Sequence, residues 1–329
     1  MANLALRNPQ FKSIAIPASG VLSTVCTVTI DGTLRYTLVK NVQPSTTINF
    51  DIAELARDYI EITYQTNYTP QTVAIETSLT NKDGLNGTGS DVGSATTITD
   101  RGFEAYGTFE EGVNPEVPFR NAPSYLISKG SSSEFTILAP NSVGGRLPHI
   151  TSLNSIGVEI YIGSDTSVTT ADGVVCNIKR IDCTKYGDGN KVVFINKYGA
   201  QQDLFFFLKQ TKNIARTNEG YKSNTITYPG GGATYSVQDA PNRVFNTQAK
   251  QSYTLSSGYY PEFANQFFEE LLLSEYIWLD PSTLNTARTS LIPVKVKTSS
   301  VAFKTSVNDR LIEYTIEFEE AFDYINNIR

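Results

Sequence analysis

The clearest alternation of apolar and polar positions lies in residues 253–322. Behind Pro261, phenylalanine and leucine recur at i, i+4 and i+8, which predicts an amphipathic helix over residues 261–274. Proline suits the first turn of a helix because the N–H it lacks would have no partner there. Glu269 and Glu270 are expected on the opposite, solvent-facing side of this helix.

Three short runs after the helix have the period of β-strands. Residues 276–279 are rich in β-forming side chains, residues 292–297 alternate, and residues 311–320 alternate between apolar and acidic or Thr positions. One buried and one wet face is typical of an antiparallel sheet, so we expect a meander covered by the helix. A hairpin between the last two runs would place Phe303 opposite Tyr314.

The N-terminal part predicts more strands and one short helix. Asp31-Gly32 is a strong hairpin-turn sequence. Asp51 followed by Glu54 indicates a capping box at the start of a helix over residues 51–59. The β-type runs of this part are residues 21–30, 34–40, 46–50 and 60–64.

The middle of the chain is again β-rich. The apolar run 204–208 is too short for a helix and predicts a strand buried on both faces. The polar segments 82–97 and 210–252 are expected to be exposed loops, the second one functional or ordered by a neighbour. Other strands are expected within residues 97–109 (a pair), 135–138, 157–162, 174–185 and 191–196.

The proline-rich segment 110–124 marks a candidate domain boundary. The expected organisation is an N-terminal β-rich domain, residues 1–124, and a C-terminal β domain, residues 125–329, which contains the helix 261–274. The fold class is mainly β, with β-sandwich or antiparallel sheets, a helix packed on the C-terminal sheet and a minor α+β character.

Composition and charge narrow the function classes. The 329 residues are 40% hydrophobic and 18% charged, with a net charge of −6, which gives no bulk electrostatic case for gripping nucleic acid. No run approaches a membrane span and the first seven residues lack a signal-peptide core, so no membrane contact is expected. The three cysteines favour buried free thiols in a reducing cytoplasm, although Cys176 and Cys183 would also fit a pair across a hairpin.

A search for catalytic and cofactor sites yields no constellation. His149 is the only histidine, in a turn-like context, and a structural role is favoured over a nucleophile–base pair. One histidine without a Cys-x-x-Cys spacing does not build a usual zinc site. Asp83, Asn86 and Asp91 offer oxygens to Ca²⁺, but turn chemistry explains them equally well.

The acidic residues around position 105 do not form a recognisable catalytic pair either. Glu104, Glu110 and Glu111 follow Asp100, and a solvated face is favoured over the carboxylate pair of a glycosidase. Residues 229–232, Pro-Gly-Gly-Gly, lack the Gly-Lys-Ser/Thr of a phosphate loop and predict a flexible turn. The expectation is therefore a protein that is not an enzyme, with no catalytic residues, no cofactor and no metal.

Five segments follow one another in a characteristic order: Phe194-Ile195-Asn196-Lys197-Tyr198-Gly199, Gly258-Tyr259-Tyr260, Leu271-Leu272-Leu273-Ser274, Leu291-Ile292-Pro293-Val294 and Ile312 to Ala321. Their order of strands and turns over residues 191–321, and more loosely 48–64, resembles tail and neck proteins of tailed bacteriophages of Bacteroidota, including the short-tailed crAss-like phages. The resemblance has no chemical signature.

The resemblance implies a virion structural protein, assembled in the bacterial host cytoplasm, that forms a symmetric ring in the neck or tail. Its partners would be further copies of itself, other tail or portal proteins, and DNA that passes through the channel without sequence-specific binding. The alternative from the residues is a carbohydrate-binding or adhesion module, because 18 Tyr and 17 Phe supply rings on which sugars stack.

Overall fold

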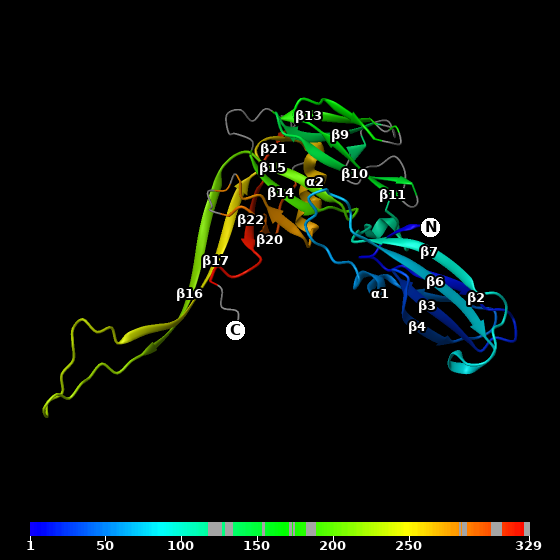
Figure 1. Cartoon of the computed structure of the whole chain (residues 1–329), viewed down its shortest axis with the longest axis horizontal. Helices are drawn as coiled ribbons and strands as arrows, with labels where there is room; N and C mark the ends of the chain where they lie inside the picture. Colours follow the sequence, from blue (N-terminus) through cyan, green and yellow to red (C-terminus); the bar gives the residue numbers. More distant parts are fainter. Residues whose placement is uncertain are drawn as a thin grey trace.

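The computed structural model divides into β-sheet units along one long axis (Figure 1). The N-terminal sheets lie at one end, a β-hairpin projects at the other, and the remaining sheets with helix α2 lie between them. The described residues are 1–117, 127–128, 134–152, 155–170, 173, 175–181, 189–282, 284, 288–303 and 311–325. The predicted boundary at residue 124 falls outside them.

The N-terminal unit consists of a five-stranded sheet and a two-stranded sheet that share one apolar core. In the larger sheet all pairs are antiparallel except β1–β7. Its strand order is β1 (Asn3–Ala5), β7 (Thr96–Phe103), β6 (Thr72–Lys82), β3 (Ser23–Ile30) and β4 (Thr33–Asn41). The smaller sheet and the helical turns are β2 (Phe11–Ala15), β5 (Thr47–Asp51), α1 (Ala53–Arg57), η1 (Leu85–Gly87) and η2 (Phe109–Glu111).

A second unit follows in the chain. Strands β9 and β13 pair in parallel, and the hairpin β10–β11 contributes to the same apolar cluster. Its four-stranded sheet has the order β12 (Ser167–Thr169), β13 (Val175–Ile181), β9 (Glu134–Pro140) and β8 (Ile127–Ser128). The separate hairpin is β10 (Gly145–Ser152) with β11 (Ser155–Tyr161).

The C-terminal unit is a seven-stranded antiparallel sheet with helix α2 packed on it. The strand order is β15 (Gln201–Phe206), β14 (Asn190–Ile195), β19 (Ile277–Leu279), β20 (Ile292–Val296), β22 (Thr315–Glu320), β17 (Asn242–Ser256) and β16 (Gln210–Lys222). A short pair, β18 (Tyr260–Pro261) with β21 (Leu311–Ile312), and the helical segments η3 (Glu262–Ala264) and α2 (Asn265–Leu273) complete it.

Two features of this sheet confirm the prediction. Strands β19, β20 and β22 are neighbours and antiparallel, as a meander requires. Phe267, Phe268 and Leu271 of α2 are buried in the same core as the sheet residues. The fold is therefore mainly β, with a helix on the C-terminal sheet. The aromatic ring of Phe303 also meets that of Tyr314 edge to face at 5.6 Å, although the predicted turn falls outside the described residues.

The helix differs from its predicted bounds of 261–274. Pro261 belongs to β18, with an extended ψ of 150°, and caps the 3₁₀ turn η3; the α-helix runs only over Asn265–Leu273. Glu270 is buried, whereas it was expected in water. It lies three positions after Phe267, and residues three apart share a helix face, so the core side includes it.

Several N-terminal predictions need correction. Residues 60–64 are not a strand, and the eleven-residue strand β6 was not expected. Asp51 belongs to β5 and Ile52 is the N-cap of α1, so no capping box forms; the Asp51 carboxylate instead accepts from Ala53 N–H at 3.1 Å. Residues 97–109 contain one strand, β7, in place of a pair.

The run 311–320 is also divided. Ile312 pairs with Tyr260 in a small separate sheet, whereas residues 315–320 pair within the large sheet. The apolar positions keep one environment across the break: Tyr314 and Phe318 are buried together with Ile312. The alternation thus predicted the buried face correctly, although the chain passes from the small sheet to the large sheet between Ile312 and Thr315.

Candidate functional site: a projecting hairpin and an aromatic pocket

Strands β16 and β17 form a long antiparallel ribbon in the segment that the sequence predicted as a loop, residues 210–252. Their register runs from Gln210 opposite Leu255 to Lys222 opposite Asn242. The base is held by the core, because Tyr253 and Leu255 are buried there and β17 pairs with β22. We call the part that leaves the body, residues 217–248, the arm; residues 223–241 at its end are the tip loop.

The arm is exposed along its length and carries apolar side chains. Every residue of β16 from Lys212 onward is exposed. The rings of Tyr221 and Phe245 contact each other across the ribbon, with centroids 6.2 Å apart, beside a bulge after Glu219. A two-stranded ribbon by itself is marginally stable in water. The arm therefore exposes apolar side chains, among them Tyr221, Val244 and Phe245, along a thin ribbon.

The tip loop contains a small ordered turn. Thr227 and Thr234 exchange two backbone hydrogen bonds of 2.8 and 2.9 Å, which close the predicted Pro-Gly-Gly-Gly turn. Gly230 and Gly231 have φ of +69° and +103°, a region that side-chain-bearing residues rarely adopt. The loop displays exposed large apolar side chains on both sides of this turn, namely Ile226, Tyr228, Tyr235 and Val237.

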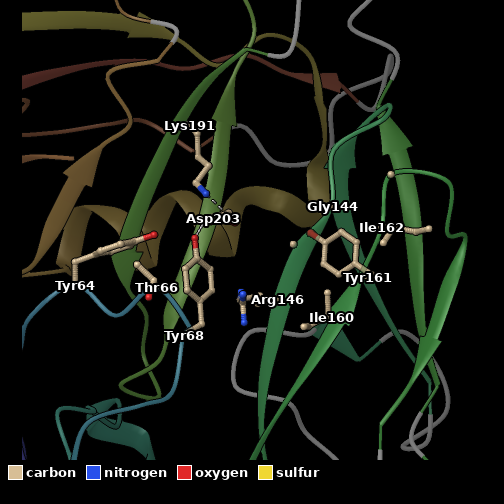
Figure 2. A pocket seen from close by; sticks show the side chains of 12 residues that line it. Tyr64, Thr66, Tyr68, Gly144, Arg146, Ile160, Tyr161, Ile162, Lys191 and Asp203 are labelled. Atoms are coloured by element: carbon tan, nitrogen blue, oxygen red, sulfur yellow. Dashed lines mark hydrogen bonds and ion pairs between the residues drawn. The ribbon is translucent and has the colours of Figure 1, made fainter. Parts of the chain in front are cut away.

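A pocket of about 480 Å³ lies where three parts of the chain meet (Figure 2). Residues 64–68 form one wall, the hairpin β10–β11 the opposite wall, and β14–β15 the floor. In Figure 2, Arg146 lies between the rings of Tyr68 and Tyr161. Ile160 and Ile162, both 60% exposed, also line the pocket on the β11 side.

The floor of the pocket holds a polar group in a buried setting. Asp203 accepts a 2.6 Å hydrogen bond from the Tyr68 hydroxyl, and Lys191 Nζ lies 3.7 Å from its other oxygen. Burial raises the pKa of Asp203, against the opposing effects of Lys191 and Tyr68. With Arg146, the pocket lining has two basic side chains and one acidic side chain.

Residues 64–68 are held over this floor by matched contacts. Gln65 N–H donates to Gln201 Oε1 at 2.6 Å, and Gln201 Nε2 donates back to the Gln65 carbonyl at 2.8 Å. The Tyr64 ring packs edge to face on Tyr68 and on Trp278, with centroids 6.3 and 6.0 Å apart. This segment therefore joins the N-terminal unit to the C-terminal sheet and shapes the pocket at the same time.

Four acidic residues, Asp100, Glu104, Glu110 and Glu111, were considered as a catalytic group. Three of them form ion pairs, each with a different basic residue. Asp100 pairs with Lys12, Glu104 with Arg57, and Glu111 with Lys197. Glu104 is only 4% exposed, and Arg57 holds both of its oxygens, so it is not the solvated residue that was expected. Glu110 is exposed. In the contacts that the structure describes, no two of these four carboxylates share a partner.

The oxygens considered for Ca²⁺ are used in turns. Asp83 accepts from Ser90 N–H at 2.6 Å, and Asp91 pairs with Lys82. Asn86 exchanges hydrogen bonds with the side chain of Asn41. Within the residues that the structure describes, no three His, Cys, Asp or Glu side chains are grouped to hold a metal ion.

The sequence predicted a turn at His149 and favoured buried free thiols at the cysteines. His149 lies in strand β10 opposite Gly157, and not in a turn. Cys26 and Cys176 are buried free thiols, and burial raises their pKa to about 11 and about 12, which keeps both in the unreactive thiol form at neutral pH. Cys183 lies outside the described residues.

The pocket residues have no local signature in the sequence, since Tyr68 and Asp203 are 135 positions apart. The exposed tyrosines and glycines of the tip loop were visible, but only as a turn in a polar segment. In the described part of the chain, no helix is both long and apolar enough to span a membrane. Comparisons of the chain with protein-family models, with curated proteins and with solved structures gave no significant match.

Proposed function

We propose that the chain is a structural subunit of a symmetric ring in the neck or tail of a bacteriophage, and that it acts through protein–protein assembly and not through catalysis. The observation that carries the proposal is the arm. Its exposed apolar side chains and thin two-stranded build favour a role in which a neighbouring subunit covers it.

The shape of the subunit supports a ring. The arm and the N-terminal unit lie at opposite ends of the long axis (Figure 1). A contact of the arm with a different surface of a neighbouring subunit would be head-to-tail. Repetition of a head-to-tail contact gives a ring if the rotation between successive subunits returns to the first subunit. If it does not, the contact gives a filament. A ring of this kind would match the symmetry of the channel that it surrounds and contact portal or other tail proteins above and below.

The charge of the chain supports passage of DNA through such a ring. The net charge is −6 overall, and residues 1–117 contain 13 acidic and 7 basic residues. An acidic wall repels the phosphate backbone, so DNA would slide past it without being held. The protein would be made in the host cytoplasm and function in the virion.

The test is localisation within purified particles. Virions would be analysed by mass spectrometry, and the protein would be located by antibody labelling and by symmetry-averaged electron microscopy of the neck and tail. The expected result is a fixed copy number in a ring around the channel. Particles that lack the protein, or that carry it only in dispersed fibres, would overturn the proposal.

A second candidate is carbohydrate binding, favoured by the pocket with Tyr64, Tyr68 and Tyr161. It ranks second because Tyr68 and Tyr161 are buried, so their rings do not form an open stacking platform. A glycan array probed with the wild-type chain and the Tyr64→Ala variant tests it. A glycan that binds the wild type and not the variant would favour this function.

A further inference from the structure

The tip loop and the pocket have complementary surfaces. The tip loop presents Tyr228, Tyr235 and Val237, the last of them 89% exposed. The pocket presents Ile160 and Ile162 at its rim. One surface is a narrow projection and the other is a concave site. Both expose apolar side chains, and removing these side chains from water is favourable.

Their charges are also of opposite sign. Asp239 is the one charged residue in the sequence of the tip loop. It is exposed, and its carboxylate makes no hydrogen bond or ion pair in the described part of the chain. The pocket lining has an excess of one positive charge from Arg146 and Lys191 over Asp203. An acidic aromatic loop therefore fits the pocket better than it fits the N-terminal unit, which is itself acidic.

The two surfaces of one molecule do not meet, because the tip loop lies at the far end of the long axis from the body (Figure 1). Both are present in every copy, so a second copy of the chain supplies a partner for each. We propose that the tip loop of one subunit docks in the pocket of the next, with Tyr228, Tyr235 and Val237 against Ile160 and Ile162 and with Asp239 near Arg146. This inference rests on the proposed ring and names the surfaces that build it.

Size and preorganisation agree with this occupant. A volume of about 480 Å³ lies in the range that holds a ligand of several rings, equivalent to a few side chains of a turn. The Thr227–Thr234 bridge fixes the tip before docking, so less conformational entropy is lost on binding. The contact joins two different patches, which makes it heterologous and able to propagate around a ring.

Cross-linking between different copies tests the contact directly. Val237→Cys and Ile162→Cys proteins would be mixed and oxidised across a concentration series. The expected result is a disulfide-linked heterodimer, roughly tenfold more abundant than in the control mixture of Val237→Cys with Leu34→Cys. Leu34 is a matched control because it is similarly exposed, at 59%, on the edge strand β4. Equal yields in the two mixtures at every concentration would overturn the docking.

Assembly of altered chains gives an independent readout. Replacement of residues 223–241 by Asn-Gly, a two-residue hairpin turn, keeps both strands while it removes the tip loop. This variant and Ile162→Glu should each weaken self-association roughly tenfold or more, measured by light scattering, whereas Leu34→Glu should not. Circular dichroism would verify that each variant is folded.

The outcomes separate the docking from the proposed function. Rings that persist in particles when both the loop replacement and Ile162→Glu are present would overturn the docking and leave the ring standing. Particles without the protein would overturn the ring. A glycan could bind the loop-replaced chain as well as it binds the wild type. If Ile162→Glu abolished this binding without any change in assembly, the pocket would be assigned to sugar and the docking would be overturned.

Discussion

The hydroxyl of Tyr68 donates a 2.6 Å hydrogen bond to the carboxylate of Asp203, and this contact fixes the segment 64–68 on the C-terminal sheet. Tyr68→Phe should lower the free energy of unfolding by about 1–3 kcal/mol, because the hydrogen bond is lost and its acceptor stays buried. Chemical denaturation measures the change. Tyr259→Phe is the control, since Tyr259 is exposed, and a loss as large as that of Tyr68→Phe would contradict the assignment.

Phe268 is the aromatic centre of the helix–sheet contact. Its ring meets those of Phe206, Tyr260 and Tyr314 edge to face, with centroids 6.2, 5.5 and 5.0 Å apart. Phe268→Ala should cost about 3–5 kcal/mol of unfolding free energy, because it removes buried contacts and leaves a cavity. The control is Phe109→Ala, whose side chain is fully exposed and whose removal should change stability by about 0.5 kcal/mol or less. Similar midpoints for the two variants would refute this ranking.

Arg57 joins the N-terminal unit to the C-terminal unit. It donates to both oxygens of Glu104 at 2.5–3.1 Å and to Glu275 at 2.7 Å. Arg57→Ala should cost about 3 kcal/mol, the low end for breaking a buried pair, because Glu104 is left buried without its cation. Lys250→Ala removes the exposed pair with Glu319 and should cost about 0–1 kcal/mol. Thermal unfolding of the two variants under one buffer condition compares them.

Glu270 should make stability depend on pH. Burial raises its pKa above the ordinary value of 4.5, although Gln266 and the Lys197 N–H oppose the shift. The folded state therefore favours the protonated acid: its stabilising contribution is present below 4.5 and is lost as pH rises through the folded pKa. Compared with Glu270→Gln, the wild type should lose stability as pH rises from 4.5 to the higher pKa of the folded state.

Gln266→Leu provides the matched comparison for Glu270. It removes the 2.9 Å hydrogen bond to the carboxylate while leaving the titratable group in place. The pKa of Glu270 should then rise further, so the loss of stability should continue to a higher pH and become larger in total. Denaturation midpoints of the three proteins across that pH range provide the measurement. A wild type that gains stability relative to Glu270→Gln as pH rises would show that the sign is wrong.

The sequence predicted those parts of the fold in which one face is buried. The alternation of β22 and the apolar spacing of α2 were both informative. Phe318 is buried between the half-buried Glu317 and Glu319, and Phe268 lies on a buried helix side while Glu269 is exposed. It did not reveal β16 and β17 as strands, because both faces of the ribbon are wet beyond Arg216, which leaves no apolar face to produce a period.

The candidate site was less accessible to sequence reasoning than the fold. Tyr64 ends the run 60–64, which was predicted as a strand, and Tyr68 follows it. The backbone of Gln65, between them, bonds to the side chain of Gln201 instead of a strand partner. Asp203 lies in a strand that was predicted as one apolar run from Leu204 onward, so its carboxylate was not considered. Only tertiary structure brings these residues together.

The position of β22 in the large sheet has a consequence for biosynthesis. This six-residue strand lies between β20 and β17, and β17 has no other partner on that side. The hairpin that carries the arm is translated more than 60 residues earlier, yet it joins the rest of the sheet only after Glu320 leaves the ribosome. Non-local pairing of this kind delays folding. A nascent chain consequently holds a free sheet edge until β22 has emerged, and capture by chaperones in that interval would limit premature contact between growing chains.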